Sequence, residues 1–558
     1  MLVAGWLAGC GGDDAPDPPV DAGADSAVVP ERDSGGIADA GPSDAPPPDA
    51  DAGGGFCASP APAADGGVCP AGATFCNEAA AAGLWAAGPA YGRGAAWVDV
   101  DGDGWEDLWQ SDSGGRTPEH PRLSVVWRNC GGLRFAPMDL GIDPDHLAFN
   151  WMGVWQDYDA DGDPDLLLAN GGYSGVAPPA LYRNDLATDG RFTEVTAEAG
   201  LLTEPAGWWS GAYADFDGDT DLDLVMTRVQ GPPALYESLG DGTFAEVSGA
   251  LPVPGDEDTD HKNPLWFDYD ADGDPDLFLA SRSDARIFRN DGASGFTDMT
   301  ASILDPLAVR REVFSAAAAD LDQDGDDDLY LGRWDQQDYI LLNEGAAGFR
   351  RLGPEVGLDM TSGKLSPENT MALSVGDLDA DGFPEVMIGP GRPEEAYHAI
   401  VLCNQGTPLS FRRCSGDVVA GHGFSRNHAI VLADPDHDGD VDFFWNLGGE
   451  VSFRDRIEED SRALPALYVQ RGATPRTVIV RLQGADSNRD AVGARIRIDG
   501  GARRWAAVRS AQGFPGQHSE WQVLSLSGAE TGELTVYWPS GGVTTRSVTA
   551  GERIEIAE

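Results

Sequence analysis

The chain has 558 residues and a formal net charge of −56, with 37 basic residues against 93 acidic ones. This balance argues against a nucleic-acid partner, because binding to phosphates requires clustered Lys and Arg. The length is more than one small hydrophobic core organises, so we expect two or more folded units.

The first ten residues, 1–10, are apolar and end in Leu-Ala-Gly-Cys. They resemble a bacterial lipoprotein signal, in which the cysteine, here Cys10, is lipidated after cleavage. The stretch is short and lacks a basic first segment, so we expect the natural start codon to lie upstream. No apolar run approaches the ~18–20 residues that span a bilayer, so we expect membrane contact through the lipid anchor only. A chance cysteine in an apolar start is the alternative.

Residues 11–56 consist almost wholly of Asp, Ala, Pro, Gly and Ser. Such a composition cannot bury a hydrophobic core, so we expect a disordered tether. A tether behind a lipid-bearing cysteine predicts an exported lipoprotein at the bacterial cell envelope or outer surface.

Six further cysteines permit disulfides in an exported protein, with fifteen possible pairings. Cys403 and Cys414 could link adjacent strands, whereas Cys57, Cys69 and Cys76 could fasten the entry to the fold; Cys130 is the sixth. Free buried thiols are the alternative, since the spacings do not match a zinc site.

One motif, Asp-x-Asp-x-Asp-Gly-x-x-Asp followed by apolar residues, occurs seven times. Two copies vary: Thr220 replaces the glycine in the third, and Glu385 replaces the last aspartate in the sixth. The carboxylates at positions one, three, five and nine, our candidate metal ligands, are Asp99, Asp101, Asp103 and Asp107; Asp157, Asp159, Asp161 and Asp165; Asp215, Asp217, Asp219 and Asp223; Asp268, Asp270, Asp272 and Asp276; Asp320, Asp322, Asp324 and Asp328; Asp377, Asp379, Asp381 and Glu385; and Asp434, Asp436, Asp438 and Asp442.

These residue types at this spacing point to calcium, a hard cation that takes about six to eight oxygen ligands. Glycine at position six lets the chain reverse sharply. A helix-loop-helix calcium loop would need Glu at position twelve, but Leu168 and Leu279 stand there and predict a buried strand instead. We therefore predict about seven structural Ca²⁺ ions in loops that join strands. An acidic turn without metal is the alternative, although like charges clustered this often repel unless a cation neutralises them.

The first aspartates of successive motifs are 52 to 58 residues apart, a period typical of propeller blades. An apolar strand precedes each motif and further strand patterns follow it, as in residues 180–184 and 192–196 after the second copy. Trp97, Trp155 and Trp266 occupy equivalent positions before the motif, where we expect packing layers. Four strands in each of seven units predict an all-β fold, a seven-bladed β-propeller over residues 57–472.

Residues 74–78 look like a fourth strand with no blade before it, whereas the seventh unit has a third strand at residues 466–469 and no clear fourth. We expect the N-terminal strand to complete the last blade and close the ring, which removes a free sheet edge. An open row of blades is the alternative.

The motif and its flanking strands resemble the FG-GAP/VCBS repeats of integrin α-chain propellers and of many exported bacterial proteins, over roughly residues 70–472. This resemblance implies that each Asp-rich loop binds calcium between the first and second strands of its blade.

From about residue 475 the motif stops and Arg becomes frequent. Alternating patterns at residues 477–482, 494–498 and 534–538 predict a small β domain over residues 475–558. Residues 487–494, 513–519 and 537–541 resemble the ASPIC/UnbV domain, with Phe514 where that family usually has Tyr. A propeller with this domain resembles bacterial relatives of cartilage acidic protein.

No nucleophile elbow, phosphate-binding loop or His-Glu-x-x-His motif occurs, and calcium accounts for the carboxylates, so we predict no catalytic residue. Trp85, Trp208, Trp209 and Trp334 fall near predicted loops and could stack on sugar rings or on a partner. We predict a monomeric, surface-anchored, calcium-stabilised binding or adhesion module for a protein or polysaccharide ligand. The alternative is a carbohydrate-active enzyme, since some polysaccharide lyases use a calcium-bearing propeller.

Overall fold

The computed structural model describes residues 74–85, 92–112, 123–144, 146–147, 150–170, 177–229, 231–247, 249–253, 260–334, 336–358, 369–391, 399–419, 427–448, 452–453, 456–457, 464–471 and 476–558. The predicted signal, the tether and Cys10 therefore lie outside the described residues. No helix within these ranges is long and apolar enough to cross a membrane.

Seven blades, each with four antiparallel strands, form the larger part of the fold, as the sequence period predicts. Blades 1 to 4 contain β2 (Gly92–Val98), β3 (Asp107–Asp112), β4 (Val125–Asn129) and β5 (Phe135–Met138); β6 (Asn150–Gln156), β7 (Asp165–Asn170), β8 (Ala180–Asp185) and β9 (Arg191–Glu194); β10 (Trp208–Ala214), β11 (Asp223–Arg228), β12 (Ala234–Ser238) and β13 (Phe244–Glu246); and β14 (His261–Phe267), β15 (Asp276–Ser281), β16 (Arg286–Asn290) and β17 (Phe296–Asp298). Blades 5 to 7 contain β18 (Val313–Ala319), β19 (Asp328–Arg333), β20 (Tyr339–Asn343) and β21 (Phe349–Leu352); β22 (Thr370–Gly376), β23 (Glu385–Pro390), β24 (Ile400–Asn404) and β25 (Phe411–Arg413); and β26 (Asn427–Ala433), β27 (Asp442–Leu447), β30 (Ala466–Gln470) and β1 (Phe75–Asn77).

The described helices are short and lie between strands. They are α1 (Leu186–Asp189), α2 (Thr300–Leu307), α3 (Ser415–Val418) and the 3-10 turns η2 (Gly292–Ser294), η3 (Gly345–Ala347) and η4 (Pro354–Val356). A two-stranded ribbon, β28 (Ser452–Phe453) with β29 (Arg456–Ile457), lies between β27 and β30 in the chain.

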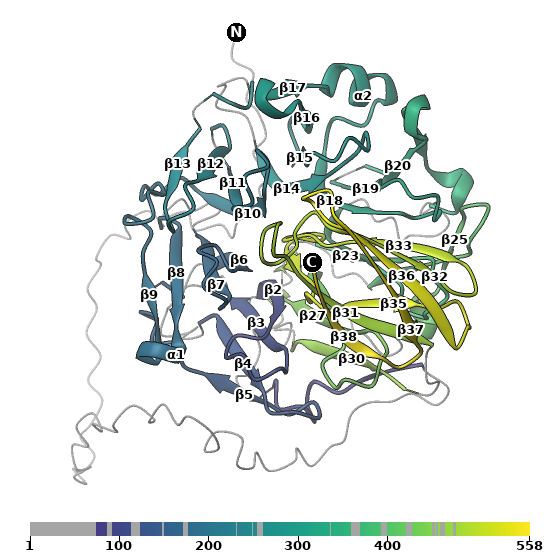
Figure 1. The fold of residues 1–558 in the computed structure, drawn as a ribbon, viewed down its shortest axis with the longest axis horizontal. Helices are drawn as coiled ribbons and strands as arrows, with labels where there is room; N and C mark the ends of the chain where they lie inside the picture. Colours follow the sequence, from purple (N-terminus) through teal and green to yellow (C-terminus); the bar gives the residue numbers. More distant parts are fainter. Residues whose placement is uncertain are drawn as a thin grey trace, which may run out of the picture.

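The first strand of each blade contacts the first strands of the two neighbouring blades, so the blades form a ring around a central channel (Figure 1). The second strands are buried almost throughout and centre on apolar residues, as β7 illustrates with Leu166, Leu167 and Leu168. Hydrophobic clusters join side chains of adjacent blades; one holds Trp109 of blade 1 against Trp155 of blade 2. Burial of these faces against one another is the main favourable term in such a fold.

The ring closes as the sequence predicts. Strand β1 pairs antiparallel with β30, with Phe75 opposite Gln470 and Asn77 opposite Tyr468. The Phe75 ring packs on Phe443 of the same blade, with 5.3 Å between ring centroids. The fourth strand of the last blade thus comes from the start of the folded chain, and its pairing with β30 joins the two ends of the propeller.

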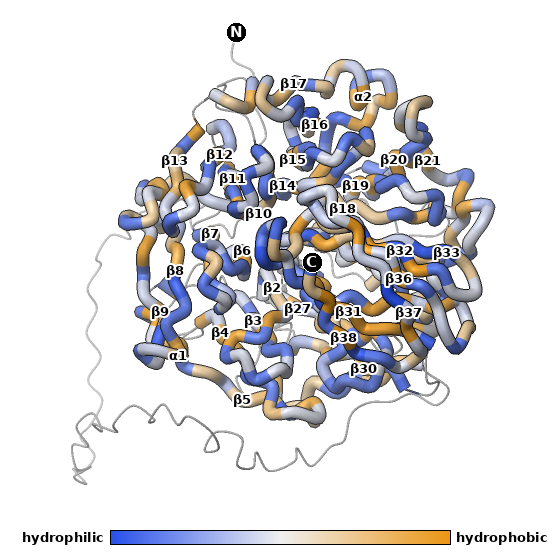
Figure 2. The backbone as a smooth tube through the Cα atoms, in the orientation of Figure 1, coloured by the Kyte–Doolittle hydropathy of each residue, from blue (hydrophilic) through white to orange (hydrophobic). Residues whose placement is uncertain are grey.

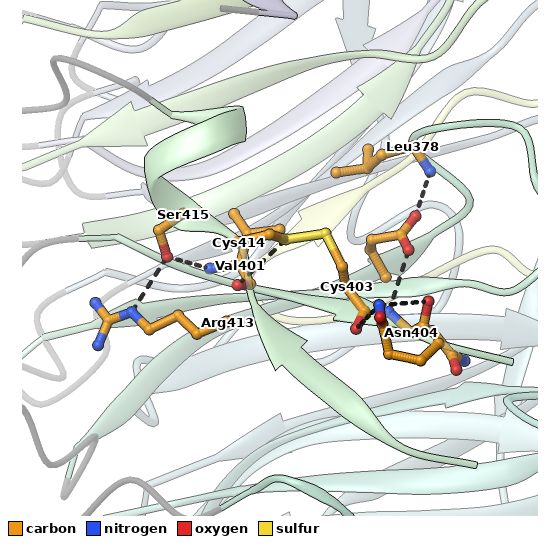
Figure 3. Close-up of a disulfide and its surroundings, with 9 residues drawn as sticks. Leu378, Val401, Cys403, Asn404, Arg413, Cys414 and Ser415 are labelled. Carbon is orange, nitrogen blue, oxygen red and sulfur yellow. Dashed lines mark hydrogen bonds between the residues drawn. A yellow bond between two sulfur atoms is a disulfide. The ribbon is translucent and has the colours of Figure 1, made fainter. Parts of the chain in front are cut away.

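A disulfide between Cys403 and Cys414, one of the pairings that the sequence permits, joins β24 to the residue after β25 in blade 6 (Figure 3). Their Cα atoms are 5.8 Å apart. Cys76 and Cys130 are also disulfide-bonded.

The C-terminal residues fold into two sheets that share one hydrophobic cluster. One sheet has the order β35–β31–β38 and the other β33–β32–β36–β37. Their strands are β31 (Thr477–Gln483), β32 (Arg495–Asp499), β33 (Arg503–Ala507), β35 (Gln522–Ser525), β36 (Thr531–Tyr537), β37 (Val543–Thr549) and β38 (Arg553–Ala557). We call residues 476–558 the small domain; its hydrophobic stretches, such as β31, appear orange in Figure 2.

The small domain lies on the propeller rather than beside it, and Figure 1 shows it over β18 to β30. Its residues 509–519, here the channel segment, run along the first strands of the blades. The Gln517 side chain donates to the Trp155 carbonyl at 2.7 Å and accepts from the Trp155 N–H at 2.8 Å. The Ser510 hydroxyl makes the same pair of bonds to Tyr213, at 2.6 and 2.8 Å. These side chains satisfy main-chain groups that no neighbouring strand reaches.

The channel segment reaches further blades through its main chain and one imidazole. Short strand β34 (Gly516–Gln517) pairs parallel with β2, and Phe514 exchanges two main-chain hydrogen bonds of 3.1 Å with Leu373 of blade 6. The Nδ1 atom of His518 accepts from the Leu432 N–H of blade 7 at 3.3 Å. Burial lowers the pKa of His518 to about 3, so the ring is neutral and can accept this bond.

Three of the tryptophans predicted near loops are instead buried, which corrects the sequence interpretation. Trp208 and Trp209 belong to β10, and Trp209 stacks on Trp151 with ring centroids 3.9 Å apart. Trp209 and Trp334 share a hydrophobic cluster with Phe514 of the channel segment. Trp85 remains partly exposed, and its indole N–H donates to the Pro465 carbonyl.

Gly513 shows how tightly the channel segment fits. It has φ +77, and a Cβ there would lie 2.1 Å from the Leu373 carbonyl oxygen. Gly541 has φ +86 but open space around it. We expect Gly513→Ala to lower stability by about 2–4 kcal/mol, because steric overlap adds to the left-handed penalty, and Gly541→Ala by about 1 kcal/mol. Differential scanning calorimetry of both variants checks this; equal shifts would contradict the packing of the segment.

Candidate metal centres

All seven motifs form the same loop between the first and second strands of a blade. In each loop the first carboxylate accepts the N–H of position five; the distances run from 3.0 to 3.2 Å. In six loops its other oxygen accepts the N–H of position six, as Asp157 does from Gly162 at 2.9 Å. Local hydrogen bonds therefore fix the loop before any ligand is considered.

Two left-handed residues bend each loop. The residues at positions four and six have a left-handed backbone conformation; in the second loop these are Ala160, at φ +58, and Gly162, at φ +109. Thr220, the residue that replaces glycine in the third copy, also adopts φ +83. A β-branched residue is strained there, so the loop shape is kept against local preference.

The structure brings together the carboxylates of positions one, three and nine. Ligand atoms lie within 4.8 Å of one another in five groups: Asp99, Asp101 and Asp107; Asp157, Asp159 and Asp165; Asp215, Asp217 and Asp223; Asp268, Asp270 and Asp276; and Asp320, Asp322 and Asp328. Two more such groups occur among the described residues. These acidic clusters of the repeats could each bind a metal ion.

In blade 6, burial and the charges of Asp377 and Asp379 raise the pKa of Glu385, and in blade 7 burial and the charge of Asp436 raise the pKa of Asp442.

The carboxylate at position five makes a hydrogen bond within its own loop. Asp161 stands outside the named group of its loop, and its Oδ1 accepts the N–H of Asp163 at 3.1 Å. The same bond recurs in the other loops. Metal ligation by Asp103, Asp161, Asp219, Asp272, Asp324, Asp381 and Asp438 therefore stays a prediction.

Position nine has a second role that the motif did not reveal. The Asp165 Oδ1 accepts the N–H of Asn184 in the third strand at 2.7 Å, and its Oδ2 accepts the N–H of Tyr158 at 3.2 Å. Asp223, Asp276 and Asp328 make the equivalent pair of bonds. This buried carboxylate fastens the loop to the blade as well as facing the cluster.

Burial makes the clustered carboxylates costly to ionise. It raises the pKa of Asp165 to about 9 and that of Asp223, Asp276, Asp320 and Asp377 to about 8, and neighbouring aspartates add to the effect. A cation among them would favour the charged forms and offset the repulsion.

Oxygen atoms without partners test whether calcium fits. Among the described residues, four such oxygen atoms are buried and have no hydrogen-bond partner. They are Oδ1 of Asp159, Asp322 and Asp436, and Oδ2 of Asp442. Three of these belong to position three of their motifs, where a ligand atom must face the ion. The donor set consists of oxygen only, which suits calcium or magnesium and not zinc. The residues at positions one, three and nine would hold such an ion.

The sequence did not reveal that the small domain touches these loops. Arg489 lies 3.5 Å from Asp157 in blade 2, and Arg553 lies 3.6 Å from Asp434 in blade 7. In the seventh loop His437 stacks on Trp105 of the first, with ring centroids 4.0 Å apart. The frequency of Arg after residue 475 was the one available signal, because arginine matches carboxylates and carbonyl oxygens.

Family comparisons agree with both parts of this architecture. A model described as FG-GAP-like repeat matches residues 157–226, 215–278, 268–331 and 320–388. A model described as ASPIC and UnbV matches residues 484–558.

Two curated relatives resemble the chain over 433 residues. Cartilage acidic protein 1 of Homo sapiens is 25% identical, and the alignment covers 72% of this chain and 62% of the human protein. The Mus musculus protein of the same name is also 25% identical, with 72% and 63% covered. The chain thus spans less than two thirds of the length of these relatives.

Solved structures with a related shape are distant. An Agrocybe aegerita lectin described as recognising non-reducing terminal N-acetylglucosamine has a TM-score of 0.38 and 19% identity, over 57% of this chain and 79% of the lectin. Sqt1 of Saccharomyces cerevisiae has a TM-score of 0.37 and 10% identity, over 66% of this chain and 81% of Sqt1.

On the two family models and the curated relatives, the chain combines an FG-GAP-repeat β-propeller with an ASPIC and UnbV domain, an architecture that it shares with cartilage acidic protein 1.

Proposed function

We propose that the protein is an exported, calcium-stabilised binding or adhesion module that recognises an acidic polysaccharide. Lipid on Cys10 would hold it at the bacterial cell surface, and residues 11–56 would serve as the tether. The repeat propeller with an ASPIC and UnbV domain fits a binding module. Because the small domain covers the end of the channel that carries the metal loops, we look for the ligand surface at the opposite end.

The observation that carries the polysaccharide assignment is a group of arginines at that opposite end, in blades 4 and 5. We call it the arginine surface, and it consists of Arg282, Arg310, Arg311, Arg333 and Arg351. They lie just after β15, just before β18, at the end of β19 and in β21. In a chain with 37 basic residues against 93 acidic ones, this concentration favours an anionic ligand.

Part of this charge is balanced and part is not. Arg282 lies 3.6 Å from Glu312, and Arg310 pairs with Asp284 and Asp305. By contrast, Arg333 donates to the Arg311 carbonyl at 2.9 Å, and Arg351 to the Leu307 carbonyl at 2.7 Å. A carbonyl oxygen satisfies the donor and leaves the positive charge, so Arg351, which is exposed, retains attraction for carboxylate or sulfate groups, whereas Arg333 is buried.

Aromatic rings accompany the arginines. The Arg333 and Arg351 guanidinium groups lie 5.2 and 4.8 Å from the Tyr339 ring centroid, and Arg282 lies 5.2 Å from that of Trp334. Stacking of this kind holds a guanidinium in a fixed plane and lowers the entropy lost when it binds an anion.

The test compares binding of the calcium-loaded protein to acidic and neutral polysaccharides by glycan array and calorimetry. We expect polygalacturonate or chondroitin sulfate to bind and dextran not to bind. Replacing Arg311 and Arg351 by Ser should weaken binding about tenfold or more, because each exposed charge pair contributes up to about 1 kcal/mol. The control replaces Arg503 and Arg546 of the small domain by Ser. Equal binding to dextran, or equal losses in both double variants, would refute the assignment.

A further inference from the structure

Polar groups of the small domain contact the metal loops of four blades. The cationic contacts are Arg489 with Asp157 at 3.5 Å, Arg495 with the Gly325 carbonyl, Arg509 with Asp327, Arg504 with the Asp381 carbonyl at 3.0 Å, and Arg553 with Asp434 at 3.6 Å. They fall in blades 2, 5, 6 and 7. The small domain therefore contacts these loops directly, in addition to the first strands that its channel segment follows.

Neutral groups of the small domain contact the same loops. Thr477 donates to the Gly439 carbonyl in blade 7, and Ser525 donates to the Ala380 carbonyl in blade 6. In blade 5 the Trp505 N–H donates to the Gln323 side chain at 2.8 Å. These partners occupy positions four and six, which are the left-handed residues that give each loop its bend. The contacts are possible only while the loop keeps that bend.

We propose that calcium binding in these loops and docking of the small domain are coupled, so that each favours the other. Calcium on the inner side of a loop would neutralise its carboxylates and hold the bend that the small domain recognises on the outer side. Without the ion the carboxylates repel one another, the bend is lost, and the arginines lose their acceptors. The coupling is reciprocal by thermodynamic necessity, so undocking must also weaken calcium binding.

The consequence lies in the channel. Residues 509–519 enter it only because the small domain is docked, and Phe514 packs there with Trp209, Phe314, Trp334 and Met371. Release of the small domain would withdraw this segment and expose the aromatic lining. Bound calcium would thus keep the small domain docked and the channel filled by residues 509–519. This inference rests on metal occupancy and not on the polysaccharide ligand.

Blade 3 provides an internal control. Its loop, residues 215–223, has the same carboxylate group, Asp215, Asp217 and Asp223. Within the described part of the chain, no hydrogen bond or ion pair joins this loop to the small domain. Blade 5, by contrast, makes three such contacts. An ion lost from blade 3 should leave docking intact, and an ion lost from blade 5 should not.

The experiment follows hydrogen exchange of the channel segment during a calcium titration of the full chain. In wild type we expect the amides of residues 510–519 to exchange at least tenfold faster once chelator has lowered the free calcium concentration. The amides of β7 and β15 should still be protected at that concentration. Asp322→Asn in blade 5 should raise the calcium concentration needed for protection about threefold or more. Asp217→Asn in blade 3 should bind one ion fewer and leave that concentration unchanged.

The reciprocal arm measures calcium by calorimetry. Arg504→Met, which removes the contact to the Asp381 carbonyl in blade 6, should weaken calcium binding about threefold or more, whereas Arg546→Met should not, because Arg546 pairs with Glu552 inside the small domain. Unchanged protection of residues 510–519 after the ions leave, or equal effects of Asp217→Asn and Asp322→Asn, would overturn the proposal. If Asp322→Asn does not fold, the wild-type titration decides: simultaneous exposure of the channel segment and the sheets would also overturn it.

Discussion

Removal of calcium is expected to lower the melting temperature of the protein by about 10–20 °C. Each loop gathers carboxylates whose burial already raises their pKa, as at Asp165, so an empty loop carries uncompensated repulsion. At ~1 mM calcium and a dissociation constant near 10⁻⁴ M, one site contributes about 1.4 kcal/mol, so seven contribute about 10 kcal/mol.

Calorimetry in calcium and in excess chelator measures this effect. Restoring calcium in excess over the chelator is the control, because it returns the original melting curve only if the loss was caused by the metal. Metal analysis of the purified protein should find about seven ions per chain. A protein that melts at the same temperature in both buffers, or folds with far fewer ions, would contradict the structural role of the loops.

Removal of the small domain, residues 476–558, is expected to leave a propeller that aggregates or melts more than about 10 °C lower. Its channel would lose the side-chain partners of Trp155 and Tyr213 and the main-chain partner of Leu373. An unpaired buried main-chain group costs about 1–3 kcal/mol, and loss of a buried Phe side chain such as Phe514 costs about 3–5 kcal/mol. The inner edges would also become open to pairing with other chains.

Size-exclusion chromatography, calorimetry and binding of a hydrophobic dye test this result. Phe514→Ala in the full chain is the matched control, since it creates one cavity and keeps every main-chain partner; it should lower the melting temperature less than truncation does. A truncated propeller that stays monomeric and melts at the same temperature as the full chain would show that the small domain does not stabilise the propeller.

The repeated loop and the ring built from it can be predicted from patterns along the chain. The spacing of Asp157, Asp161 and Gly162 within one motif specifies hydrogen bonds that close within five residues, so neighbours in the chain suffice to form the loop. The apolar run after each motif predicts the second strand for the same local reason. Even ring closure by residues 74–78 followed from counting strands, because the seventh unit lacked its fourth.

The docking position of the small domain, and the space that it fills, could be seen only in the folded molecule. The bonds between Gln517 and Trp155, and between Ser510 and Tyr213, join residues hundreds of positions apart, and no local pattern encodes them. The same reason explains the buried Trp209 and Trp334: a tryptophan suits a sugar-binding loop or a core equally well, and only the packed channel distinguishes the two. Local hydrogen bonds and the hydrophobic period depend on residues close together in the sequence. The fit between the small domain and the propeller depends on two surfaces that form only when both have folded.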